Sequence, residues 1–225
     1  MWLAALPAWV RAWSGPGKLL ALPQIYHFTD VANLPEILAA GELRCHRIAR
    51  TVVDVGNASI KSRRGLINVT CGPRGKVCDY VPFYYAARSP MLYSIMCGNV
   101  PDVNPDQRRL VYLVSSTEAV YEAGLACVFT DGNAATAFTR FHEDPAELDH
   151  VVDWPLMRAR YWFNTAEDPD RRRRRMAEFL VYQSLPLESV AGVVVYDRDA
   201  ESHVAAVLRA AGSALPLAIR RAWYF

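Results

Sequence analysis

Short apolar runs, each ended by turn-forming residues, constrain the fold of this chain more than any other feature. They lie at 24–28, 81–87, 110–114, 126–129, 177–183, 192–196 and 217–223. Runs of this length, rich in aromatic and β-branched residues, are typical of β-strands. Helical patterns stand between some of them, but without the regular strand–helix alternation of a doubly wound parallel sheet. The sequence therefore predicts a mixed α/β (α+β) fold.

The clearest helix signals surround residues 33–41. Asp30 or Asn33 can cap a helix there, Pro35 lies in its first turn, and Gly41 stands where a left-handed C-terminal residue is expected. Other helical patterns lie at 58–64, 89–96, 117–123 and 198–211.

The chain has 225 residues, of which 52% are hydrophobic and 21% charged. This composition excludes a disordered chain, a collagen-like fibre and a coiled coil, and the length suits one large domain. Met1 to Trp13 is apolar but lacks a basic start and a cleavage pattern, which disfavours an export signal. We therefore expect one domain over 24–225, and we interpret residues 1–23 as an N-terminal extension whose mobility stays open.

The five cysteines form no CxxC pair and no metal-binding spacing with histidine. Their odd number disfavours a disulfide framework, so a reducing cytoplasm fits best, and we expect no metal. No apolar run approaches the roughly 18 residues that a membrane span requires, so we expect no membrane association.

Arginine dominates the basic residues. Of the 25 lysines and arginines, 22 are arginine, and residues 171–175 are an unbroken arginine run. A guanidinium group forks onto phosphates and stacks on bases, so the bias suits a nucleic-acid or phosphate ligand. Tyr161 and Trp162 precede the run, and single strands are held by such aromatic and basic side chains together. A GC-rich genome and a solvated surface stay open as alternative explanations.

The standard nucleotide and hydrolase signatures are missing: the sequence has no GxGxxG after a strand, no P-loop, no HExxH and no GxSxG. Instead, polar residues stand where a core would not select them. His27 interrupts one apolar run, and Glu178 stands near the start of another. Taken singly, each is more often structural or solvent-exposed than functional. The irregular stretch 47–77 is predicted to be a functional or a disordered loop.

Five blocks of sequence carry a resemblance to a known family. They are Ile25-Tyr26-His27-Phe28-Thr29 with Asn33-Leu34 and Gly41, Lys61-Ser62-Arg63-Arg64, Asp79-Tyr80-Val81-Pro82-Phe83-Tyr84 with Arg88-Ser89-Pro90-Met91-Leu92-Tyr93, Phe129-Thr130-Asp131-Gly132 with Arg140-Phe141, and Arg174 to Tyr182. In this order they resemble the DarT family of DNA ADP-ribosyltransferase toxins, over residues 24–225. The third block is the most specific.

The resemblance implies a single ADP-ribosyltransferase domain with a split, mainly antiparallel sheet around an NAD cleft. It implies transfer of ADP-ribose from NAD to a base in single-stranded DNA, with release of nicotinamide and thymine as the favoured base. It also implies a partner, the DarG-like macrodomain antitoxin. The alternatives are a guanine-specific enzyme, an RNA-directed ADP-ribosyl- or phosphotransferase, and a non-catalytic nucleic-acid-binding module.

By the same resemblance, Glu178 and Arg64 are the catalytic residues. Glu178 is expected to stabilise the positive charge that develops on the ribose. Arg64 is expected to hold the diphosphate and to acidify the acceptor base through its charge. Arginine is a poor base, because it keeps its proton to about pH 12.

The cofactor-binding residues implied are His27, Phe28, Thr29 and Arg64, with Tyr84 able to stack on nicotinamide. The DNA-contact candidates are Tyr161, Trp162, Arg171, Arg172, Arg173, Arg174 and Arg175. One departure from the family lies at 137–139, Ala-Phe-Thr, where some members carry a histidine.

Overall fold

A computed structural model describes residues 23–225, and residues 1–22, nearly all of the predicted extension, lie outside this part. The large sheet contains β1 (Gln24–Asp30), β3 (Tyr80–Tyr84), β4 (Leu110–Ser116), β5 (Cys127–Thr130), β6 (Phe141–His142), β7 (Glu178–Tyr182), β9 (Gly192–Val195) and β10 (Leu217–Ile219). A second sheet pairs β2 (Glu42–Arg44) with β8 (Ser184–Pro186). The α-helices are α2 (Leu34–Ala40), α3 (Ala58–Arg64), α4 (Pro90–Met96), α5 (Thr117–Glu122), α6 (Leu148–Val151), α7 (Trp154–Arg158), α8 (Arg171–Arg174) and α9 (Arg198–Ala210).

The strands of the large sheet follow the order β10-β9-β4-β1-β3-β7-β5-β6. Neighbouring strands are antiparallel except β9 and β10, which are parallel. The predicted mixed α/β fold with a mainly antiparallel sheet is confirmed.

The sheet is split between β1 and β3. Strand β1 pairs with β4 along its whole length, but with β3 only where Tyr26 faces Tyr84. Continuing that register would place Pro82 opposite Phe28. Proline has no N–H to donate to a ladder, and the Pro82 carbonyl is instead bound by the His27 side chain. The two halves of the sheet therefore separate beyond Tyr26, and a pocket lies at the separation.

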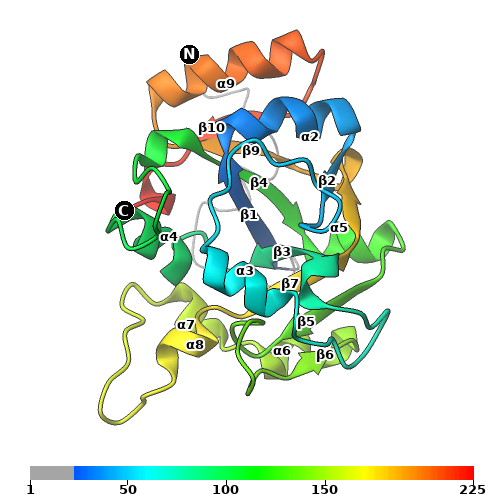
Figure 1. Ribbon diagram of the computed structural model, residues 1–225, viewed down its shortest axis with the longest axis vertical. Helices are drawn as coiled ribbons and strands as arrows, with labels where there is room; N and C mark the ends of the chain where they lie inside the picture. The colour runs from blue at the N-terminus through cyan, green and yellow to red at the C-terminus, as the bar shows by residue number, and fades with distance from the viewer. Residues whose placement is uncertain (1–22) are drawn as a thin grey trace, which may run out of the picture.

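The two faces of the sheet belong to different hydrophobic clusters, as the period-two alternation of strands requires. On one face, Phe83, Leu113 and Phe179 pack with residues of α2 and α9. Figure 1 shows these two helices side by side at one end of the sheet. On the other face, Tyr26 and Tyr112 pack with aromatic residues near the C-terminus.

Each strand and helix predicted above is present in the structure; the helix over 58–64 has the predicted ends, and most of the others differ by one or more residues. The strand predicted over 81–87 stops at Tyr84, and the one predicted over 217–223 stops at Ile219 because the chain continues into a 3-10 turn. Gly41 has the expected left-handed conformation, with φ of 70°. Strands β2, β6 and β8 were not predicted, because two or three residues are too few to show a periodicity.

A buried hydroxyl near the C-terminus gives a test of how this half of the sheet is held. Tyr224 is 2% exposed, and its hydroxyl lies 3.0 Å from the Leu110 carbonyl and 3.1 Å from that of Val194, so it joins β4 to β9. Tyr224→Phe should lower the free energy of unfolding by about 1 kcal/mol, the net value of one such bond. Thermal unfolding should show a loss of roughly 2–4 °C. An unchanged Tm would contradict this role.

Candidate active site

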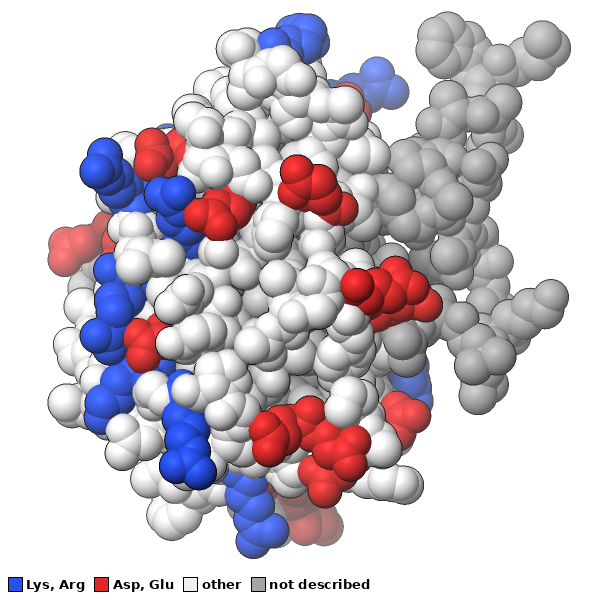
Figure 2. Space-filling model, turned by 90° about the vertical axis from the view of Figure 1, so that its right-hand side faces the viewer, with Lys and Arg blue, Asp and Glu red and all other residues white. Residues whose placement is uncertain are grey.

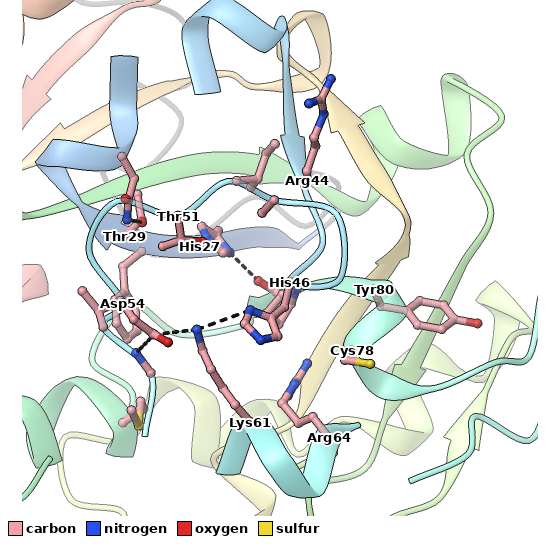
Figure 3. Close-up of a pocket in the computed structure, with 18 of the residues that line it drawn as sticks. His27, Thr29, Arg44, His46, Thr51, Asp54, Lys61, Arg64, Cys78 and Tyr80 are labelled. Atoms are coloured by element: carbon pink, nitrogen blue, oxygen red, sulfur yellow. Dashed lines mark hydrogen bonds and ion pairs between the residues drawn. The ribbon is translucent and has the colours of Figure 1, made fainter. Parts of the chain in front are cut away.

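The main pocket opens at the split in the sheet. Its floor comes from His27, Phe28 and Thr29 of β1, from Pro82 and Tyr84 of β3, and from Glu178 of β7. Helix α3 and residues 49–57, which we call the covering segment, form the opposite wall. Figure 3 shows this segment arching across His27 and Thr29. Two stretches more than 100 residues apart in sequence, α3 and β7, thus meet in one cavity.

Glu178, the first residue of β7, has a fixed side chain. It is 2% exposed, and its carboxylate accepts a hydrogen bond from the Ala134 amide at 3.0 Å and one from Arg64 Nη1 at 2.7 Å. Its own amide donates to Thr130 Oγ1 at the end of β5, at 2.9 Å. Because both partners of the carboxylate are donors, the site suits the ionised form.

Arg64 reaches this carboxylate from the last turn of α3. The helix begins where the Asn57 side chain accepts from the Ser59 and Ile60 amides, so its position depends on a cap within the irregular stretch 47–77. The Arg64 side chain is 14% exposed. Its Nη2 atom is buried and has no hydrogen-bond partner among the described residues. A buried unpaired donor is costly, so the pocket favours a ligand that offers an oxygen here.

His27 lies beside this pair as a neutral imidazole. Its Nδ1 is 2.8 Å from the Pro82 carbonyl and must donate to it, which leaves Nε2 as an acceptor for a ligand hydroxyl. Burial lowers the pKa of His27 to about 4; the Pro82 carbonyl opposes the shift, and the positive charges of Arg64 and Lys61 add to it.

Two aromatic rings extend the floor. Phe28 and Tyr84 stack across the split, with ring centroids 6.1 Å apart and planes 14° from parallel. One face of Tyr84 is thus taken by Phe28. Burial, with a smaller contribution from the charge of Glu178, raises the pKa of Tyr84, so its hydroxyl stays protonated.

A charged cluster joins the covering segment to α3. Lys61 Nζ lies 2.5 Å from Asp54 Oδ1 and 3.5 Å from His46 Nδ1 (Figure 3). Burial and the charge of Lys61 lower the pKa of His46. Lys61 and Arg64 are both on α3 and both line the pocket, so a diphosphate would meet two positive charges there.

A second pocket continues from the first. The two share Ile60, Met91, Asn133 and Met176, and the second is further lined by Pro90, Ser94, Thr136, Asn164, Arg172 and Arg173. It therefore leads from the Glu178 end of the main pocket toward α8, which lies at the lower left of Figure 1 beside a long loop.

Two predicted DNA contacts are wrong. Trp162 is 3% exposed and packs edge-on against Tyr93, so its ring is not available to stack on a base. Arg175 is 5% exposed and donates to the carbonyls of Leu156, Met157, Ala159 and Arg88, which makes it a structural residue. Burial, with the charge of Arg88, lowers the pKa of Arg175 to about 10.

The rest of the arginine run is divided. Arg173 pairs with Asp170 and Asp131, and Arg174 pairs with Asp153 and Asp168. Arg171 holds the preceding loop through the carbonyls of Tyr161 and Phe163, whereas Arg172 is exposed and lines the second pocket. Tyr161 is 66% exposed. Tyr161 and Arg172 are thus the predicted contacts most accessible to a strand.

Sequence reasoning missed other residues of this region. The covering segment, Asn133 and Met176 line the pockets, and Phe138 and Phe163 are exposed aromatic side chains, 85% and 50% accessible. A large aromatic residue between two small ones, as in Ala137-Phe138-Thr139, is a signal that could have identified Phe138.

Within residues 23–225, no three His, Cys, Asp or Glu side chains gather so that they could hold a metal ion. The same part of the chain has no helix with the length and apolar character needed to cross a membrane. The five cysteines, all in this part, are free thiols.

Solved structures give the class. The fold matches that of Thermus sp. 2.9 DarT in complex with ADP-ribosylated ssDNA, with a TM-score of 0.85 at 35% identity, over 90% of this chain and 96% of that chain. The same Thermus protein in complex with NAD+ matches with a TM-score of 0.80 at 32% identity, over 92% and 100%. The molecule is an ADP-ribosyltransferase.

Sequence comparison gives the family. The family model "ssDNA thymidine ADP-ribosyltransferase, DarT" matches residues 26–225, so the chain belongs to the DarT family. A Thermus aquaticus DNA ADP-ribosyl transferase is 37% identical over 218 residues, 93% of this chain and 94% of that protein. A Thermosipho africanus relative, 22% identical over 80% of this chain and 44% of its own length, is a DNA ADP-ribosyl transferase-DNA ADP-ribosyl glycohydrolase fusion protein.

The lowered pKa of His27 predicts a pH dependence of stability. Between pH 6.5 and about 4 the unfolded chain binds a proton at this imidazole and the folded chain does not. The free energy of unfolding should therefore fall as the pH falls through this window, by up to about 3 kcal/mol. Urea unfolding of the wild type and of His27→Gln at several pH values isolates the contribution. If the difference in unfolding free energy between wild type and His27→Gln does not change with pH, the predicted contribution of His27 is contradicted.

Proposed function

We propose that the protein transfers ADP-ribose from NAD to a thymine base in single-stranded DNA, with Glu178 and Arg64 as the catalytic pair. One observation carries the assignment: the buried carboxylate of Glu178 is bound to the Arg64 guanidinium at the point where the split sheet opens. NAD-dependent transfer to single-stranded DNA is the activity of the family to which the chain belongs.

Glu178 supplies a fixed negative charge. Breaking the bond between nicotinamide and ribose develops positive charge on the ribose. The carboxylate is held by Ala134 and Arg64 where water screens it little. It stabilises the developing charge more than it stabilises neutral ribose, and that difference accelerates the reaction.

Arg64 offers the substrates its buried Nη2 atom. Nη1 is used by Glu178, and the buried Nη2 has no partner among the described residues. We assign this atom to an oxygen of NAD and the positive charge to lowering the proton affinity of the acceptor base. His27 Nε2 is available for a ribose hydroxyl, and the free face of Tyr84 is available for nicotinamide.

The second pocket supports entry of the acceptor strand from the side of α8. It joins the main pocket beside Glu178, and the exposed Arg172 lines it. Figure 2 shows most of the Lys and Arg side chains of the displayed face along one edge, with some Asp and Glu side chains among them and others toward the opposite side. That edge faced the viewer in Figure 1, on the side of α3. A basic edge attracts the phosphates of a single strand.

We also propose that the protein is a toxin that acts in the cytoplasm and is paired with a macrodomain antitoxin that removes the adduct. The support is the Thermosipho africanus relative, in which a transferase and a glycohydrolase form one chain.

The test of the activity is incubation of the purified protein with NAD and a pool of single-stranded DNA oligonucleotides, read by mass spectrometry. We expect each thymine-containing target to gain the mass of one ADP-ribose. Glu178→Gln keeps the shape of the side chain without its charge and should slow transfer by about 10²–10³-fold, as the loss of one electrostatic contact does. Glu188→Gln, at an exposed position, is the control and should transfer at the wild-type rate.

The acceptor is decided in the same experiment. Oligonucleotides without thymine and RNA of matched sequence are included in the pool. An adduct on guanine or on RNA would replace the proposed acceptor and keep the enzyme class. Equal transfer by Glu178→Gln and wild type would remove Glu178 from the catalytic pair.

Arg172 is predicted to contribute to DNA affinity through a phosphate. Arg172→Gln should weaken oligonucleotide binding and reduce the slope of log K against log salt concentration by about 0.7, the value for one phosphate of a single strand. Nicotinamide release without DNA should not change. Arg209→Gln removes an exposed arginine of α9 and is the matched control. An unchanged slope in Arg172→Gln would show that this arginine is only solvated.

A further inference from the structure

The covering segment forms much of one pocket wall without regular secondary structure. Eight of its nine residues line the main pocket, all but Val52, whose side chain is 70% exposed. Lys61 of α3 binds the segment through an ion pair with Asp54, and both of these residues line the pocket. Such a segment is mobile unless its backbone is bound to the body of the protein.

Asn33 binds this backbone from inside. Its Oδ1 accepts from the Val52 amide at 2.8 Å and the Val53 amide at 2.9 Å, and its Nδ2 donates to the Val53 carbonyl at 2.7 Å and to Thr29 Oγ1 at 2.9 Å. The side chain is 4% exposed. The orientation of the amide follows from its partners, because two N–H groups require the oxygen and a carbonyl requires the nitrogen.

The position of Asn33 relative to β1 is itself fixed. It ends a 3-10 turn (Val31–Asn33) that begins where the Asp30 side chain accepts from the Ala32 amide. Asp30 is also bound through two hydrogen bonds to Arg109. Asn33 precedes α2 but makes no side-chain cap to it. The Asn33 side chain instead forms its hydrogen bonds with Thr29 and with the covering segment.

We propose that Asn33 is a positioning residue for NAD: it fixes the covering segment over the pocket at a set distance from β1. Both amide hydrogens and both acceptor positions of its side chain are used within the protein, so it acts through the segment and not by binding NAD itself. The inference rests on the proposed binding of NAD in this pocket. Removing the Asn33 side chain should weaken NAD binding more than DNA binding, because DNA is proposed to enter by the second pocket.

The experiment measures equilibrium binding of NAD without DNA, together with hydrogen exchange of the Val52 and Val53 amides in the free protein. Asn33→Ala should weaken NAD binding by about tenfold or more, since more than one hydrogen bond of about 1 kcal/mol is lost. Exchange at the two amides should quicken by a similar factor, and the Kd for an oligonucleotide should change by less than about threefold. Tyr224→Phe, a substitution of a buried side chain that lines neither pocket, controls for general loss of stability.

A second pair of variants tests the hydrogen bonds between Asn33 and the covering segment by changing the segment instead of Asn33. Val52→Pro removes one N–H that binds Asn33, and Val52→Ala keeps it, at a position whose side chain is exposed. We expect Val52→Pro to weaken NAD binding and Val52→Ala to leave it unchanged.

The outcomes separate the two proposals. Faster exchange at Val52 and Val53 with an unchanged Kd for NAD would overturn the role of Asn33 and leave the proposed function intact. Equal weakening of NAD binding by Tyr224→Phe and Asn33→Ala would also overturn it, because the effect would then be one of stability. A wild-type protein that binds no NAD would overturn both.

Discussion

The early end of pairing between β1 and β3 is the constraint on which the rest of the structure depends. The ladder ends after Tyr26 and Tyr84, and Pro82 cannot continue it because it has no N–H. The hydrogen bond from His27 to the Pro82 carbonyl spans the separation. Strand β3, at which the pocket opens, therefore also fixes the His27 side chain in the pocket. The split thus lies at the pocket in which His27, Arg64 and Glu178 come together.

The rest of the site converges on that opening from irregular chain. Helix α3 has seven residues and no buried ones, so packing contributes little to its position. Its place depends on the Asn57 cap and on two ion pairs, one to the covering segment and one to Glu178. The buried pair between Arg64 and Glu178 therefore has both a structural and a chemical role, since it also attaches α3 to strand β7.

The fold could be predicted where the pattern was local. The alternation of apolar residues predicted β7, including the shared face of Leu180 and Tyr182. A capping residue, a proline and a glycine predicted α2. The polar residues of the pocket needed the family resemblance, because a single His or Glu in a strand has several explanations. Their roles in NAD binding and catalysis remain predictions.

The errors and omissions have one physical reason: burial depends on partners distant in sequence. Arg175 reads as part of a basic run, but its partners are carbonyls up to 87 residues away. Trp162 is covered by Tyr93. Asn33 looked like a helix cap, and its actual partners lie 19 and 20 residues further along, in a segment with no pattern of its own.

The split has one more consequence, for aggregation. Unpaired strand edges are templates on which other chains can add β-structure, and most sheets carry them at their outer limits. Here β1 beyond Tyr26 is such an edge in the middle of a sheet, opposite α3 and beneath the covering segment. The enzyme can therefore keep open backbone beside its substrate without offering it to a neighbouring molecule.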